Sequence, residues 1–80
     1  MTKEQKQRIL ADWYYNLPAR IQASRRLELI KYLDINKTTF YNWVGGRAEI
    51  SNYVWNRGIL EFFKRIGYEY TAPQGAAEAL

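Results

Sequence analysis

The chain has 80 residues and a net charge of +4, and 48% of its residues are hydrophobic. This composition is typical of one small globular domain rather than of a disordered segment. The chain contains neither cysteine nor histidine, which excludes disulfides, thiolate metal sites and the commonest general base. Its apolar runs are too short to span a membrane, and its polar beginning does not resemble a secretory signal, so we expect a cytoplasmic protein with no membrane partner.

The remaining chemistry argues against an enzyme. The carboxylates are scattered along the sequence, and there is no glycine-rich phosphate loop. We therefore predict no catalytic residue, no metal site and no cofactor.

Positive charge is concentrated in the first part of the chain. Residues 1–47 contain nine Lys or Arg and four Asp or Glu, whereas residues 48–80 contain three and four. A basic half suits a polyanionic partner such as nucleic acid. An ordinary solvated surface is the alternative interpretation.

Two helices are predicted in the first 33 residues. Thr2 and Gln5 have the spacing of a capping box, and an apolar stripe with helical spacing follows it, so we expect a helix over residues 3–16. Pro18 cannot continue that helix but can occupy the first turn of another. The second helix is predicted to begin near Pro18 or, alternatively, at Ser24. The apolar residues on one face of this helix are Leu27, Ile30 and Leu33.

A sharp turn and a third helix follow. Asp34 tolerates a left-handed backbone, and Asn36 is a strong N-cap candidate. The third helix is predicted over residues 37–44. It should end at Gly45 and Gly46, because glycine relieves the strain of a left-handed C-terminal residue.

The fourth predicted helix begins at Ser51 or Asn52 and extends to about residue 66. Gly58 lies inside it at a cost of about 1 kcal/mol relative to alanine, and a close helix crossing or a bend would explain that glycine. Residues 71–80 are small and polar and are predicted to form a flexible tail. We therefore expect an all-α fold, a small bundle of four helices with five as the alternative, in one domain over residues 1–70.

The third helix has two different faces. Phe40, Trp43 and Val44 share one side and are expected in the core. The outer side should carry four polar or aromatic side chains, with Thr39 at its edge: Lys37, Thr38, Tyr41 and Asn42. Lysine, threonine and asparagine can all contact base edges in a major groove. No carboxylate, which phosphate would repel, occurs between residues 36 and 48.

The stretch RLELIKYLDINKTTFYNWVGGR, residues 26–47, resembles the helix-turn-helix of phage-repressor and Cro-type (XRE-type) transcriptional regulators. The resemblance implies a helix-turn-helix over about residues 24–46, whose recognition helix, residues 37–44, enters the major groove of double-stranded DNA. Two positions depart from the family pattern. Ile30 replaces a small residue, and Asp34 replaces the usual glycine.

The resemblance also assigns contacts residue by residue. Lys37, Thr38 and Asn42 fall where such proteins contact bases, and Arg26 and Arg47 fall where they contact phosphates. From their positions beside these residues, we add Tyr41 to the expected base contacts and Arg25 and Thr39 to the expected phosphate contacts.

Aromatic residues make up 16% of the chain, more than a domain of this size is expected to bury completely. Such a surplus is typical of a partner surface. We therefore predict a homodimer through the fourth helix, as in repressors that bind palindromic sites. The same surplus favours an alternative function, a protein-interaction module that retains a helix-turn-helix shape, such as an antitoxin or a phage accessory protein. RNA binding also remains open.

Overall fold

The computed structural model describes residues 1–70, which contain helices and no strands. The helical elements are α1 (Lys3–Tyr15), α2 (Ala19–Leu33), α3 (Lys37–Val44), α4 (Asn52–Val54), the π-helical η1 (Trp55–Ile59) and α5 (Leu60–Ile66). Because α4, η1 and α5 follow one another without interruption, they form a single helical rod over residues 52–66. The expected all-α, four-helix fold is therefore confirmed. The predicted tail, 71–80, lies outside the described residues.

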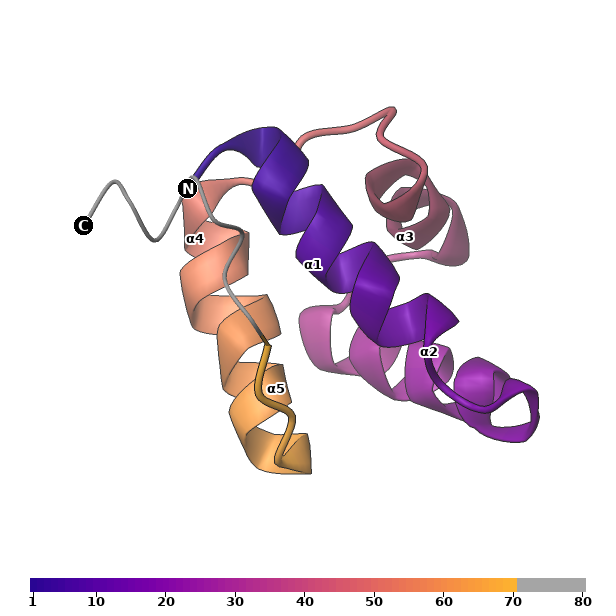
Figure 1. The fold of residues 1–80 in the computed structure, drawn as a ribbon. Helices are drawn as coiled ribbons and strands as arrows, with labels where there is room; N and C mark the ends of the chain where they lie inside the picture. The colour runs from indigo at the N-terminus through magenta and orange to yellow at the C-terminus, as the bar shows by residue number, and fades with distance from the viewer. Residues whose placement is uncertain (71–80) are drawn as a thin grey trace.

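Helix α1 is central in the fold. It lies between the rod formed by α4, η1 and α5 and the short helix α3, while α2 runs beneath it (Figure 1). The contacts agree with this view, since α1 packs on both α2 and α3, and α2 also packs on η1. The buried hydrophobic side chains come from all four helices and from the linker before the rod: Ile9, Leu10, Trp13, Tyr14, Leu29, Phe40, Trp43, Ile50, Trp55, Ile59, Phe62 and Phe63.

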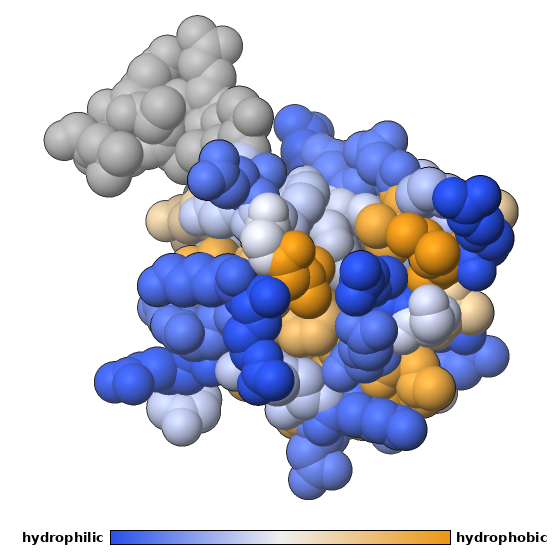
Figure 2. Space-filling model, turned by 90° about the horizontal axis from the view of Figure 1, so that it is seen from below, coloured by the Kyte–Doolittle hydropathy of each residue, from blue (hydrophilic) through white to orange (hydrophobic). Residues whose placement is uncertain are grey.

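The surface is mixed in character. Seen from below, it is mainly hydrophilic, and its hydrophobic areas are patches bordered by hydrophilic side chains (Figure 2). The most exposed large hydrophobic side chains of the described residues are Tyr53 at 76%, Tyr15 at 59% and Leu27 at 50%. Part of the aromatic surplus is therefore exposed, as expected for so small a core.

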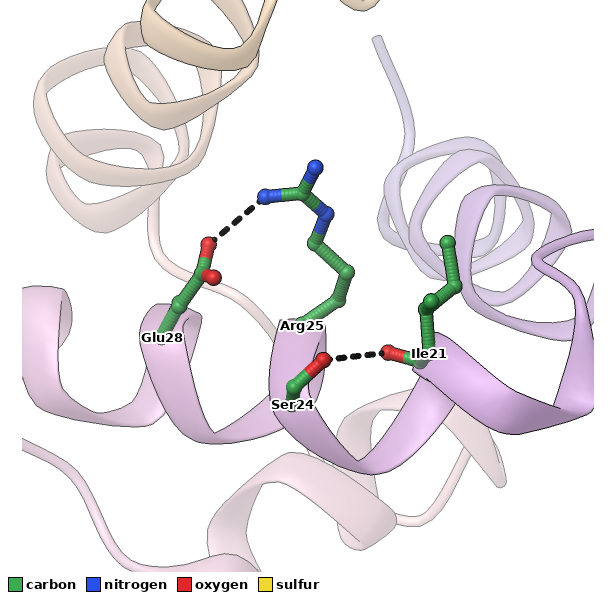
Figure 3. A network of polar contacts seen from close by, with 4 residues as sticks. All are labelled: Ile21, Ser24, Arg25 and Glu28. Carbon is green, nitrogen blue, oxygen red and sulfur yellow. Dashed lines mark hydrogen bonds and ion pairs between the residues drawn. The ribbon is translucent and has the colours of Figure 1, made fainter.

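The starts of α1 and α2 follow from local hydrogen bonds. The capping box of α1 is present: the Gln5 amide donates to Thr2 Oγ1 at 3.2 Å, and the Thr2 amide donates to Gln5 Oε1 at 2.8 Å. Pro18 is the N-cap residue of α2. Ser24 lies within the helix, where its hydroxyl donates to the Ile21 carbonyl at 3.0 Å (Figure 3). Of the two predicted starts, the one near Pro18 is correct.

The apolar face expected for α2 was partly wrong. Leu27 is half exposed, whereas Leu29 is completely buried, with Ile30 and Leu33 packed beside it. The inward positions are 26, 29, 30 and 33, a helical i, i+3, i+4, i+7 pattern. Arg26 occupies the first of them, so the apolar pattern alone pointed to the wrong leucine.

Gly58 marks the point where the rod crosses α2. A Cβ atom placed on Gly58 would lie 2.4 Å from Leu33 Cδ2, far inside normal van der Waals contact. The close helix crossing, one of the two explanations predicted for this glycine, therefore accounts for it. The crossing holds the C-terminal end of α2, from which the turn to α3 begins.

Candidate nucleic-acid interface

The turn between α2 and α3 is formed as predicted. Asp34 adopts a left-handed backbone with φ 56° and ψ 48°, a conformation that glycine adopts most readily and that aspartate tolerates. Asn36 caps α3, its side-chain oxygen accepting the Thr39 amide hydrogen at 2.8 Å. Only residues 34–36 separate α2 from α3, which is the length of the short turn between the two helices of a helix-turn-helix.

The inner side of α3 is packed against α1. Phe40 is completely buried and Trp43 is 6% exposed. The Phe40 ring meets the Tyr14 ring edge-to-face, with centroids 5.0 Å apart. At about 25 cal/mol per Å² of apolar area, burying two large aromatic side chains contributes several kcal/mol. This packing fixes which side of α3 faces outward.

The outer side of α3 is polar and contains no carboxylate. Lys37 and Thr38 are exposed, and Thr39 and Asn42 are half-buried. Tyr41 differs from the expectation of an outward side chain. It is half-buried, its hydroxyl accepts a hydrogen bond from Arg26 at 2.8 Å, and Lys37 Nζ lies 5.9 Å from its ring centroid. Tyr41 is therefore tied to α2 through Arg26 and does not point freely into solvent.

Arg26 connects three helices. Its Nη1 donates to the hydroxyls of Tyr14 on α1 and Tyr41 on α3, both at 2.8 Å. Burial raises the pKa of Tyr14 above its ordinary value, and the hydrogen bond with Tyr41 adds to this, while Arg26 opposes it. The hydrogen bond with Tyr14 raises the already high pKa of Arg26. Both acceptors are tyrosine hydroxyls rather than carboxylates, so these two hydrogen bonds give the guanidinium beside α3 no acidic partner.

Arg25 lies one residue before this cluster and has a different environment. It forms an ion pair with Glu28 at 2.9 Å within the same helix (Figure 3), and its side chain is 39% exposed. Exposed ion pairs of this kind contribute less than about 1 kcal/mol. Arg25 can therefore exchange Glu28 for another anion at small cost.

Arg47 folds back over the end of α3. Its Nε donates to Asn42 Oδ1 at 3.2 Å, and its Nη2 donates to the Tyr41 carbonyl at 3.3 Å. Arg47, which was expected to contact a phosphate, is therefore hydrogen-bonded to Asn42, which was expected to contact a base.

The linker after α3 is held by polar residues that the sequence patterns did not indicate. Gln7 donates to the Ala48 carbonyl. The Lys6 ammonium is buried and donates to the Ile50 carbonyl at 3.3 Å and to the Asn52 side chain. Lys6 precedes the buried Ile9 and Leu10 by three and four positions. That spacing was the available signal, because it places Lys6 on the inward face of α1.

Comparison with models of known protein families, with curated proteins and with solved structures gave no match. Within residues 1–70, no helix is long and apolar enough to cross a membrane. The same residues contain no group of three or more acidic side chains arranged to hold a metal ion.

Proposed function

We propose that the protein binds double-stranded DNA sequence-specifically and acts as a transcriptional regulator of the phage-repressor type. The observation that carries this proposal is the division of α3 into two faces. Phe40 and Trp43 hold the inner face in the core, while the outer face exposes Lys37 and Thr38 and has no carboxylate. The resemblance of residues 26–47 to the helix-turn-helix of such regulators supports the same conclusion.

The chemistry of this face suits a major groove. The groove is about 12 Å wide and admits an α-helix. Lys37 can donate to guanine O6 and N7, and the Thr38 methyl can pack against the thymine methyl. Arg25, one residue before Arg26 on α2, is paired with the exposed Glu28 and can exchange this partner for a phosphate. Arg26 holds α3 in place with a positive charge beside the same surface.

The test is binding of a fluorescent mixed-sequence duplex at two salt concentrations. Contacts from several cations to phosphates should make the affinity fall at least tenfold between 50 and 200 mM salt. Lys37→Ala should weaken binding, whereas Lys64→Ala, which removes the same charge from an exposed position on α5, should have little effect. Absence of binding at 50 mM salt, or equal losses in both variants, would contradict the proposal.

We also propose a homodimer through the rod. Tyr53 lies in the first turn of this rod and is 76% exposed, which is unusual for a large aromatic side chain outside an interface. A twofold dimer would present two α3 helices to a palindromic site. Light scattering should give twice the chain mass, and Tyr53→Ser should shift the protein to the monomer. A wild-type monomer at high concentration would exclude this arrangement.

The exposed hydrophobic side chains also favour one alternative function, a protein-interaction module. Tyr15 and Leu27 are at least half exposed, and both lie outside α3. If the protein bound neither duplex DNA nor RNA at low salt, this alternative would be preferred.

A further inference from the structure

The hydrogen bond between Arg47 and Asn42 determines the orientation of the Asn42 amide. Arginine has only donors, so the Asn42 atom that faces Arg47 Nε at 3.2 Å must be Oδ1. The Asn42 NH₂ group then points away from the arginine. A second hydrogen bond, from Arg47 Nη2 to the Tyr41 carbonyl at 3.3 Å, holds the guanidinium in the plane that this contact requires.

Gly45 provides the space for this arrangement. Its backbone has φ −87° and ψ −2°, a conformation with negative φ that residues other than glycine adopt in type I turns. The position therefore does not need glycine for its backbone angles, unlike Gly46 with φ 77°. A Cβ atom on Gly45 would instead lie 2.8 Å from Arg47 Nη1 and 3.0 Å from the Tyr41 carbonyl oxygen, which accepts from Arg47 Nη2. The absence of a side chain at position 45 thus allows Arg47 to lie against the end of α3.

The pair keeps hydrogen-bond donors that the chain does not use, and it lies at the surface, with Arg47 exposed and Asn42 half-buried. Among the described residues, Arg47 Nη1 and Asn42 Nδ2 have no hydrogen-bond partner within the chain. Asn42 Oδ1 keeps a second lone pair, but the guanidinium beside it makes the local potential positive. An approaching acceptor is therefore favoured at this position, and an approaching amino group is disfavoured.

We infer that Arg47 and Asn42 act as one unit that recognises guanine. In the major groove, guanine presents two acceptors, N7 and O6, whereas adenine presents the acceptor N7 beside the N6 amino group. Two free donors beside a guanidinium match the two acceptors of guanine, and the positive potential opposes the amino group of adenine. The base contact expected for Asn42 is thereby assigned to guanine, and Arg47 contributes to this base contact instead of to the phosphate contact expected for it. The inference rests on the proposed function. It adds that the contacted base is guanine and that Arg47 orients the Asn42 amide toward it.

The experiment begins with selection from a random duplex library by the wild-type protein. Each guanine of the selected site is then replaced singly by 7-deazaguanine, which lacks the N7 acceptor, and the affinity is measured for the wild type and three variants. Gly45→Ala should displace the end of Arg47 while keeping every charge and every DNA-facing side chain. Arg47→Lys keeps the charge but loses Nε. Lys64→Ala on α5 is the matched control for charge. Thermal unfolding of each variant confirms that it is folded.

For at least one guanine, the 7-deaza substitution should lower wild-type and Lys64→Ala affinity about tenfold, the scale of one good base contact. In Gly45→Ala and Arg47→Lys, the affinities for the guanine and the 7-deazaguanine duplex should become nearly equal. Their affinity for mixed-sequence duplex should stay within about threefold of the wild-type value. If both variants discriminate as the wild type does at every guanine, the inference is overturned and the proposed function stands. A selected site without such a guanine would also overturn the inference alone. A wild-type pool with no enrichment would overturn both.

Discussion

The crossing of η1 and α2 offers a sharp test of the packing that positions α3. In the Gly58→Ala variant, the new Cβ would lie 2.4 Å from Leu33 Cδ2, more than about 1 Å inside the usual contact distance of carbon atoms. Replacing glycine by alanine in a helix raises the free energy of unfolding by about 1 kcal/mol. Overpacking of this kind lowers it by about 1–3 kcal/mol. We therefore expect Gly58→Ala to destabilise the protein by about 1 kcal/mol.

The sign of this effect should reverse when the obstructing atom is removed. In a Leu33→Ala background, Cδ2 is absent, so Gly58→Ala should stabilise that variant by up to about 1 kcal/mol. The coupling energy of the double-mutant cycle should thus be about 1–3 kcal/mol. Asn56→Ala, on an exposed position of the same segment, measures helix propensity without the contact and should stabilise both backgrounds equally.

Urea unfolding followed by circular dichroism measures all four corners of this cycle. A difference of 1 kcal/mol corresponds to about 4–8 °C in the melting temperature of a domain of this size, so thermal melts provide a second measurement. Equal effects of Gly58→Ala in the two backgrounds would show that Leu33 moves aside freely. The crossing would then not explain why position 58 is glycine.

Two further predictions concern α3 and its support. Phe40→Ala, at a completely buried position, should lower the free energy of unfolding by about 3–5 kcal/mol in urea titrations; a loss below 1 kcal/mol would mean that Phe40 does not anchor the helix. Burial raises the pKa of Tyr14 in the folded state, so the folded protein retains a proton that the unfolded chain loses above about pH 10. The stability that Tyr14 contributes is therefore complete below that pH and declines as the pH rises above it, and Tyr14→Phe should make the decline between pH 9 and 11 shallower in unfolding titrations; an unchanged slope would contradict this.

The features that depend on near neighbours along the chain were predictable from the sequence. The Thr2–Gln5 capping box, the left-handed Asp34 and the Asn36 cap all form as expected. Each involves residues at most three positions apart, so residue type and spacing contain the required information. The burial of Phe40 and Trp43 was equally predictable, because an aromatic pair at helical spacing in a small domain has few places other than the core.

The features that depend on distant residues were not predictable in this way. Arg26 occupies an inward position of α2 that a hydrophobicity pattern assigns to a leucine, and it is satisfied there only because Tyr14 and Tyr41 bring their hydroxyls from two other helices. Likewise, the buried ammonium of Lys6 depends on a carbonyl 44 positions away along the chain. A polar group can be buried only where such partners meet it, and a local pattern does not contain the position of a partner on another helix.

The sequence by itself therefore determined the helices, the turn and the side of α3 that faces the core, since these follow from backbone preferences and from the periodicity of apolar residues. Only the tertiary structure decided how the outer side is arranged: Tyr41 drawn toward Arg26, and Arg47 lying over Gly45 against Asn42. The physical reason is that hydrogen bonds between side chains depend on distances within a few tenths of an ångström. Those distances are set by the packing of α1, α2 and α3 and by the path of the chain after α3.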